Sequence, residues 1–522
     1  MKEFISRWAA DVTGVLSGFD RLLFRGTLRS LFFVGGMMGY LWNRRILLKD
    51  FGAHVEATTE RIREASTRKA LQLGREVRYL NAPSLRKEDV AMEIARRDGI
   101  KEGLVCVLSS VEPCFSFGIF RNRERKLLEL QPQLRKCLHY YHYWLSRDWG
   151  LMHGRIQTWF PFTVHVCMNG RQALARRFDH AGLAYQQRDN CFPWVEDPEE
   201  AQRLADEMMR INWPRMLTRV SRELNPAHED IFRDTPREYY WSVCQSEWAT
   251  DVMFRSPERL AALYPRLLHH GMTAFRSPDV MRFLGRTVPA HTGHIDRRFQ
   301  GEVVTDLRHR PEGVRLKHAL GRNSIKLYDK QGSVLRVETT INDPAEFKVF
   351  RAKEGRPKGK RTWRELRRGV ADLHRRARVS QAANQRYLKA LAAVDCTDKL
   401  EDLVPPICQP TEWRGRRLRG LNPWGKDQAL LSALGRGEFA IRGLRNRDLR
   451  MILAPASEQD PSERRRQTAR TSRLLRLLQA HRLIHKVPQT HRYILSDKAH
   501  SLLAALSAAA RATPKQLATL VA

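Results

Sequence analysis

The chain has 522 residues and a net charge of +35, because 92 Lys and Arg residues stand against 57 Asp and Glu residues. This length allows several buried cores, and three or four domains are expected. So basic a composition favours a polyanionic partner, most commonly nucleic acid, and the lack of a separate Lys-rich amphipathic helix argues against a membrane surface.

The cysteine pattern and the N-terminus exclude further classes. The eight cysteines are scattered without a Cys-x-x-Cys pair, which argues against a zinc ribbon and against the disulfide framework of a secreted protein. The N-terminus lacks a basic segment followed by an apolar one, and the most apolar run, residues 30–43, is too short to span a bilayer. We therefore expect a cytoplasmic, nucleoid-associated protein with reduced cysteines.

Residues 1–130 predict an α/β domain. Apolar alternation and helical periodicity place strands and helices at residues 18–26, 55–73, 76–80, 86–97 and 103–114. Asp20 and Glu112 then lie in or at the ends of strands. Strand-end carboxylates hold metal ions in RNase H-like nucleases, whereas two acids without a third favour surface or capping roles.

Residues 131–350 predict a central β-rich domain with a helical insert. Strands are expected at 137–145, 151–159 and 162–168, followed by a helix at 172–180 that stops at Gly182. His139, Tyr141 and Tyr143 share one face of the first of these strands. Aromatic rings bordered by basic residues can stack on unpaired bases, and the alternative is a well-packed aromatic sheet.

The helical insert covers residues 195–285, with helices expected at 197–210 and 239–254. Helical spacing puts Glu247 and Asp251 on one face of the second helix, beside Trp241 and Trp248. Because unpaired buried acids are costly, these two carboxylates are either metal ligands or partners of the abundant arginines.

Residues 313–343 predict an antiparallel meander that is the candidate active site. Strands at 314–318, 324–330 and 334–341 alternate apolar with polar residues, and Gly-Arg-Asn and Gln-Gly-Ser supply the turns. Its polar face carries Lys326, Tyr328, Lys330, Arg336 and Glu338. Tyr328 is the candidate nucleophile, Glu338 the candidate ligand of Mg²⁺ or Mn²⁺, and the cations are candidate phosphate contacts. The alternative is an ordinary solvated sheet face with cross-strand ion pairs.

Two segments of this meander resemble a known family. Residues 324–330, Ser-Ile-Lys-Leu-Tyr-Asp-Lys, and residues 335–341, Leu-Arg-Val-Glu-Thr-Thr-Ile, are similar to the "IYDK … RVE" strands of plasmid and phage rolling-circle replication initiators. The resemblance implies a tyrosine, here Tyr328, that cuts one DNA strand and stays attached to its 5′ phosphate. The chain lacks the His-x-His metal motif that a firm assignment to this family requires.

Residues 351–410 predict a basic helix with a linker on each side. Gly and Pro interrupt the chain at 354–360, and the Pro-rich residues 405–410 form the second linker. A helix is expected at 363–391, in a region where Lys and Arg greatly outnumber acids. Such a helix contacts phosphates whatever the base sequence, and the alternative is a solvated helix face.

Residues 411–522 predict a winged-helix DNA-binding domain. The expected order is helix 427–434, strand 438–441, helices 444–453 and 468–481, hairpin strands 483–487 and 492–496, and helix 497–506. The third helix buries leucines at helical spacing and leaves its basic side chains for DNA. On the helix these basic residues are Arg470, Arg473 and Arg476, and Arg466 lies just before it as a further candidate DNA contact. The segment resembles MarR-type winged-helix domains, and the whole chain resembles bacterial proteins often labelled MarR-like; a protein-binding winged helix is the alternative.

These expectations together describe an α+β multidomain protein with an N-terminal α/β unit, central antiparallel sheets with helices, and a C-terminal winged helix. Two functions fit them. The first is a DNA endonuclease or strand transferase of a mobile element or replicon, which uses Mg²⁺ or Mn²⁺ and a tyrosine nucleophile. The second is a non-catalytic winged-helix regulator. Both predict contact with duplex DNA, and the first adds single-stranded DNA in the central domain.

Overall fold

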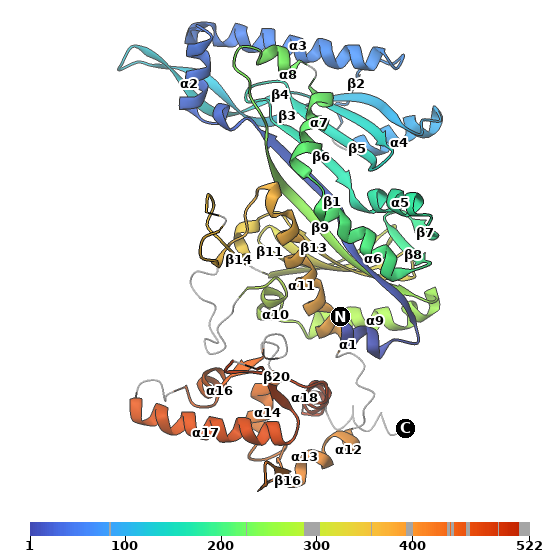
Figure 1. Ribbon diagram of the computed structural model, residues 1–522, viewed down its shortest axis with the longest axis vertical. Helices are drawn as coiled ribbons and strands as arrows, with labels where there is room; N and C mark the ends of the chain where they lie inside the picture. The colour runs from blue at the N-terminus through green and yellow to red at the C-terminus, as the bar shows by residue number, and fades with distance from the viewer. Residues whose placement is uncertain are drawn as a thin grey trace. The chain divides into compact units, whose positions relative to one another are not determined.

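The structure is a computed structural model that describes residues 1–510 apart from 83–84, 226, 287–302, 357, 393–399, 436–438, 440–442, 456–459 and 489. Helices and strands are mixed throughout the chain, as expected from the sequence (Figure 1). Two compact units share the chain. One comprises Met1–Val12, Phe254–Val337 and Ala382–Ala522, and the other comprises Thr13–Met253 and Glu338–Gln381. Within the described residues, no helix has the length and apolar character needed to cross a membrane.

The largest sheet has the strand order β10-β11-β12-β13-β9-β1-β6-β5-β4-β3-β2. Its strands are β1 Val12–Thr27, β2 Arg78–Tyr79, β3 Gly103–Asn122, β4 Leu127–Ser146, β5 Gly150–Gln157, β6 Val164–Asn169, β9 Tyr240–Phe254, β10 Val303–Arg310, β11 Gly313–Leu320, β12 Asn323–Lys330 and β13 Val334–Ile341. The sheet is mixed, because β2 pairs parallel with β3 while β3 to β6 pair antiparallel. The domain boundary expected after residue 130 falls inside β4.

Helices of the second unit cover its part of the sheet (Figure 1). They are α2 Val34–Asn43, α3 Phe51–Leu71, α4 Lys87–Arg97, α5 Gly170–Ala181, α6 Pro198–Glu207, α7 Trp213–Leu224 and α8 His228–Ile231. In α3 the buried residues recur every three or four positions, from Phe51 through Val55 to Ile62 and Ala70, which is the spacing of one helix face. These residues join a core that also takes in β1, β4, β6 and α7.

Helix α5 begins and ends where its sequence predicts. The Asn169 side chain accepts hydrogen bonds from the backbone N–H groups of Arg171 and Gln172, and Gly182 ends the helix with a left-handed φ of 68°. At its first residue, Gly170, a Cβ atom would lie 2.1 Å from the carbonyl oxygen of Phe19. Only glycine therefore lets the start of α5 approach β1 beside Asp20.

The helix expected at residues 239–254 is wrong, because these residues form β9. Most residues from Ser246 to Phe254 are buried, as in a strand covered on both faces. Aromatic and β-branched residues such as Trp248, Thr250 and Val252 fit a strand well, and tertiary packing overrides the helical spacing that suggested otherwise.

The expected meander is confirmed as β11, β12 and β13, with β10 as a further partner on β11. Its polar face is not the solvated surface of the alternative interpretation. Lys326, Tyr328, Lys330, Arg336 and Glu338 are all buried. In the first unit, α9 Pro257–Thr273 packs on these strands, where the Tyr264 hydroxyl donates to the carbonyl of Val314 at 2.6 Å. This unit also contains α1 Lys2–Arg7 and α10 Ser277–Phe283.

The basic helix expected at 363–391 is wrong over its first ten residues. These residues contain β15 Thr362–Glu365, which pairs with β14 Lys348–Arg351, and the helix α11 covers only Leu373–Leu391. After β15 the buried side chain of Leu366 anchors the chain, which then turns into the short helix Val370–Asp372. The linker expected at 405–410 contains the short helix α13 Pro405–Cys408.

The C-terminal segment has its own hydrophobic core. Its elements are α12 Leu400–Leu403, β16 Thr411–Trp413, β17 Arg416–Leu418, α14 Gln428–Leu434, β18 Leu444–Arg445, α16 Asn446–Leu453, α17 Pro461–Ala480, β19 Ile484–Lys486, β20 Arg492–Leu495 and α18 Asp497–Ala509. Strands β18, β20 and β19 form a three-stranded sheet in that order. The strand expected at 438–441 lies largely outside the described residues, and its Phe439 is helical.

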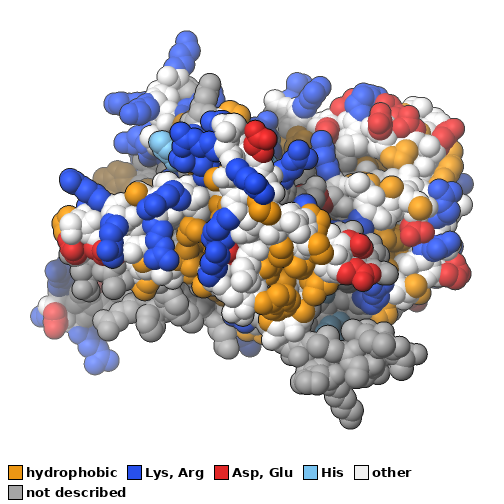
Figure 2. Space-filling model, turned by 90° about the horizontal axis from the view of Figure 1, so that it is seen from below, with side chains coloured by type: hydrophobic (Ala, Val, Ile, Leu, Met, Phe, Trp, Pro, Cys, Tyr) orange, Lys and Arg blue, Asp and Glu red, His pale blue; other side chains and the backbone are white. Residues whose placement is uncertain are grey.

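Basic side chains are prominent on the face of the molecule seen in Figure 2, where Lys and Arg (blue) are spread widely and acidic groups are confined to smaller areas. On α17 the arginines at 466, 470, 473 and 476 are exposed, whereas Leu475, Leu477 and Leu478 are buried. The helix therefore separates an apolar face from a basic one, as its sequence predicts.

Candidate metal centre

Three acidic residues from neighbouring strands come together in the second unit. Asp20 lies in β1, Glu247 in β9 and Glu338 in β13, which are adjacent in the sheet order β13-β9-β1. One carboxylate oxygen of each lies within 4.8 Å of the others. Asp20 and Glu338 are buried and Glu247 is half-buried. Segments far apart in the sequence thus contribute to one cluster, which we call the acidic triad.

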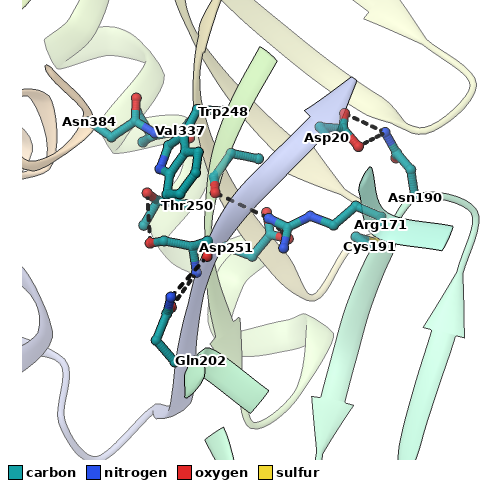
Figure 3. Close-up of polar contacts among 12 residues, drawn as sticks. Asp20, Arg171, Asn190, Cys191, Gln202, Trp248, Thr250, Asp251, Val337 and Asn384 are labelled. Carbon is teal, nitrogen blue, oxygen red and sulfur yellow. Dashed lines mark hydrogen bonds and ion pairs between the residues drawn. The ribbon is translucent and has the colours of Figure 1, made fainter. Parts of the chain in front are cut away.

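Asn190 fixes the orientation of the Asp20 carboxylate. It lies in the turn between β7 Tyr185–Arg188 and β8 Cys191–Val195, and its Nδ2 donates to the two oxygens of Asp20 at 3.0 and 2.7 Å (Figure 3). A carboxylate held by an amide in this way keeps one orientation, as ligands of metal sites commonly do.

Asp251, a candidate metal ligand from its sequence position, pairs with arginine instead. Its Oδ2 lies 3.0 Å from Nη2 of Arg171, and both side chains are 0% exposed. The same Arg171 nitrogen donates to the carbonyl oxygen of Ala249 at 3.1 Å. Of the two outcomes left open for Glu247 and Asp251, arginine pairing thus holds for Asp251, while Glu247 joins the acidic triad.

Hydrogen bonds from α11 and β1 hold β9 in place near the triad. Trp248 Nε1 donates to Oε1 of Gln381 at 2.7 Å, and the Thr250 hydroxyl donates to the same oxygen at 3.2 Å. The Ser17 hydroxyl in turn donates to Thr250 Oγ1 at 3.0 Å. Because successive strand residues face opposite sides, Glu247 points away from the sheet face that carries Trp248 and Thr250.

The donor set of the acidic triad fits a hard divalent cation. Three carboxylates at this separation repel one another strongly unless cations or protons offset their charge, and burial weakens the screening by water. Carboxylate oxygens are the ligands that Mg²⁺ and Mn²⁺ prefer. Asp20, Glu247 and Glu338 are therefore the residues that would hold such an ion.

The other candidate residues of the meander lie in the first unit. Tyr328 is buried, and the Nζ of Lys330 lies 5.5 Å from the centre of its ring. Lys326 and Arg336 are buried as well. The register pairs Tyr328 with Arg315 and Lys326 with Lys317, so the predicted grouping of cations around the tyrosine is present in the β11–β12 pair.

Glu112 belongs to a separate polar cluster on β3 to β5 and does not join Asp20. It accepts hydrogen bonds from Tyr141 and Ser110, and pairs with Lys87 at 3.2 Å and Arg155 at 2.8 Å. Burial disfavours its charged form, but these hydrogen bonds and charges outweigh burial and lower the pKa of Glu112 to about 2. The adjacent His139, Tyr141 and Tyr143 are buried, so this face is a packed aromatic sheet and not an exposed stacking surface.

Sequence patterns single out each member of the acidic triad without grouping them. They assign Glu247 and Glu338 to different sites, and they associate Asp20 only with Glu112. An acid within the apolar run of β1, between Phe19 and Leu22, is the available signal. Grouping the three requires the strand order, which local patterns do not contain.

Comparisons of the chain with family models, with curated proteins and with solved structures found no match.

Proposed function

We propose that the protein binds DNA and cuts or joins a strand at the acidic triad with the help of Mg²⁺ or Mn²⁺. The observation that carries this proposal is the meeting of Asp20, Glu247 and Glu338 within 4.8 Å on three neighbouring strands. Carboxylates gathered in this way are a common means of holding the metal ions of phosphodiester chemistry.

The net charge of +35 supports nucleic acid as the substrate. A nuclease needs to hold a polyanion near a cluster of negative groups, which requires cations elsewhere on its surface. The exposed arginines of α17 supply such cations in the C-terminal segment. The order α14, β18, α16, α17, β19, β20 supports a winged helix whose recognition helix is α17.

Each residue has a distinct part in this proposal. A divalent ion, when bound, supplies charge that polarises the phosphoryl oxygens and acidifies a water molecule. Asp20, Glu247 and Glu338 would hold that ion, and the hydrogen bonds from Asn190 would keep the Asp20 carboxylate in one orientation. Tyr328 is the candidate nucleophile if the reaction forms a covalent intermediate, and water is the alternative.

Incubation of the full chain with single-stranded and duplex DNA in Mg²⁺ or Mn²⁺ tests the proposal. Cleavage or joining is expected with the wild type and is expected to disappear in Asp20→Asn, Glu247→Gln and Glu338→Gln. Glu199→Gln changes an exposed acid in the first turn of α6 and is the matched control, which should stay active. Activity that survives in all three triad variants would contradict the proposal.

The same reactions decide which group attacks the phosphate. A protein–DNA adduct that resists denaturation and disappears in Tyr328→Phe would assign the tyrosine as nucleophile. Cleavage without an adduct that persists in Tyr328→Phe would assign water.

A non-catalytic DNA-binding regulator is the second candidate function. It is favoured by one observation, namely that the exposed arginines of α17 lie in a segment with its own hydrophobic core. If the wild type binds duplex DNA but cleaves no DNA form with either metal, this second function is preferred.

A further inference from the structure

The hairpin β14–β15 exposes two aromatic rings to solvent. Phe350 and Trp363 are directly opposite in its antiparallel register, with ring centroids 5.8 Å apart. Phe350 is 56% exposed and Trp363 is 70% exposed. A solvated strand face normally carries polar side chains, so two large aromatic side chains next to each other on it indicate a binding surface.

The opposite face of the hairpin anchors it to the protein. Phe347, Val349 and Leu366 are buried, and the N–H of Leu366 donates to the carbonyl of Phe347 at 2.8 Å. The exposed rings are therefore not the packing face of the hairpin. They lie on the face of the hairpin that is exposed to solvent.

Buried Asp372 stabilises the base of the hairpin. Its carboxylate binds the Arg367 guanidinium through two hydrogen bonds of 3.0 and 2.9 Å and also binds Arg375. Arg351, at the end of β14, donates from two nitrogens to the carbonyl of Glu365 at the end of β15. These contacts hold both strands, so the two rings keep a defined position before any ligand arrives.

The hairpin is also strongly basic. From residue 348 to residue 365 the sequence has eight Lys or Arg and two acidic residues. The exposed cations are Lys348, Lys353, Arg356, Lys358, Lys360 and Arg361. Exposed aromatic rings within a cationic surface match a ligand that has both planar apolar groups and regularly spaced negative charges.

We infer that the Phe350–Trp363 pair stacks on unpaired bases of a nucleic-acid strand, whose phosphates the surrounding Lys and Arg side chains neutralise. This inference rests on the proposed nucleic-acid function and adds the state of the substrate. Stacking requires the flat face of a base, which a continuous duplex hides between neighbouring base pairs. The hairpin therefore selects single-stranded or unpaired regions, while α17 is the proposed contact for duplex DNA.

Cross-strand aromatic pairs also stabilise hairpins without any ligand, and the test must separate the two roles. Replacing Phe350 and Trp363 by Leu keeps apolar side chains in the pair and removes the aromatic faces. Phe350→Leu alone serves as the second variant if the double variant does not fold, as judged by circular dichroism and thermal melting. Trp42→Ala removes an 83% exposed tryptophan from α2 and is the matched control.

Fluorescence anisotropy with the full chain in EDTA measures binding without cleavage. The probes are a labelled single-stranded DNA, an abasic strand of the same length, and the corresponding duplex. Stacking on a base is worth a factor of about 5 to 150 in affinity. Phe350→Leu/Trp363→Leu should therefore weaken single-strand binding by about that factor, with abasic and duplex binding little changed, and Trp42→Ala should bind all three probes like the wild type.

Three results would overturn the inference. One is equal single-strand affinity of the wild type and the folded Leu variants. Another is an equal loss on the abasic strand, which would leave only a charge or folding effect. The third is a membrane result, in which the wild type binds vesicles that contain anionic lipid and the Leu variants do not, while all of them bind single strands equally. That result would assign the two rings to a membrane surface. Because the measurement needs no metal and no activity, loss of single-strand affinity in the Leu variants supports the inference whether or not the protein cleaves DNA.

Discussion

Asn190 and Asp20 lie 170 residues apart in sequence, yet the amide nitrogen of Asn190 is 3.0 and 2.7 Å from the two carboxylate oxygens of Asp20. The turn between β7 and β8 thus carries a group whose structural role is to orient one member of the acidic triad. Residues that act through a metal ligand are expected to change metal affinity more than the chemistry itself.

Asn190→Ala should therefore lower the affinity for Mn²⁺ by about 10- to 100-fold, because the Asp20 carboxylate is then without this hydrogen-bond donor. Any activity of the variant should recover as the metal concentration rises, whereas Asp20→Asn should stay inactive at every concentration. The apparent metal constant from a titration of activity, compared with a calorimetric titration, checks this. Identical metal affinity in the variant and the wild type would show that Asn190 has no positioning role.

Asp251→Asn should destabilise the protein by about 3–5 kcal/mol, because it leaves the buried charge of Arg171 without this carboxylate. Urea unfolding at neutral pH measures the change. The double variant Arg171→Met/Asp251→Leu removes both charges and should recover much of the stability. A single variant as stable as the wild type would mean that the ion pair contributes little.

Glu112 predicts a dependence of stability on pH. Its pKa in the folded protein is about 2, below the usual value of about 4.5 for a glutamate, so the folded state favours the carboxylate. The stabilisation is complete above the unfolded pKa and is lost as the pH falls from about 4.5 toward 2. Glu112→Gln should cost about 1–3 kcal/mol at about pH 7.

The difference in unfolding free energy between the wild type and Glu112→Gln should therefore shrink from about pH 5 down to the lowest pH at which both proteins fold. Urea unfolding across this range gives the difference directly. A difference that stays constant or grows as the pH falls would contradict the assignment of these hydrogen bonds and ion pairs to the ionised carboxylate.

The proposed contact of the C-terminal segment with duplex DNA is tested at Arg466, Arg470 and Arg473. Replacing all three by Ala should weaken binding and reduce the slope of log affinity against log salt by about 0.9 for each phosphate that is no longer neutralised. Arg215, Arg219 and Arg222 on α7 are also exposed and form a control triple of equal charge, which should change the slope less. Equal effects of both triples would mean that the basic surface binds DNA without a preferred helix.

Local elements of the fold are largely predictable because their signals are local. The alternation in residues 324–330 and 334–341 predicts β12 and β13, and Gly182 predicts the end of α5. The spacing within residues 240–254 does not distinguish a helix from a strand, because Glu247 and Asp251, four positions apart, share a face in either structure. This segment forms a strand because it pairs with β13 on one side and β1 on the other, and such pairing depends on residues far apart in the sequence.

The acidic triad is unpredictable for the same reason. Residue type alone marks Glu338 and Glu247 singly as metal ligands, but only the order β13-β9-β1 brings them to Asp20. Asp251 pairs with Arg171, whose position at the start of α5 depends on the approach of Gly170 to Phe19. Residue types therefore indicate the chemistry, while the partners follow from tertiary structure.

Isothermal titration calorimetry of Mn²⁺ into the full chain reports on metal binding by the acidic triad without assuming a substrate. We expect saturable Mn²⁺ binding by the wild type and by Glu199→Gln, and loss of that binding in Asp20→Asn and Glu338→Gln variants that melt like the wild type. Equal Mn²⁺ binding by the wild type and both triad variants, or no binding by the wild type, would contradict the assignment of the acidic triad as a metal site.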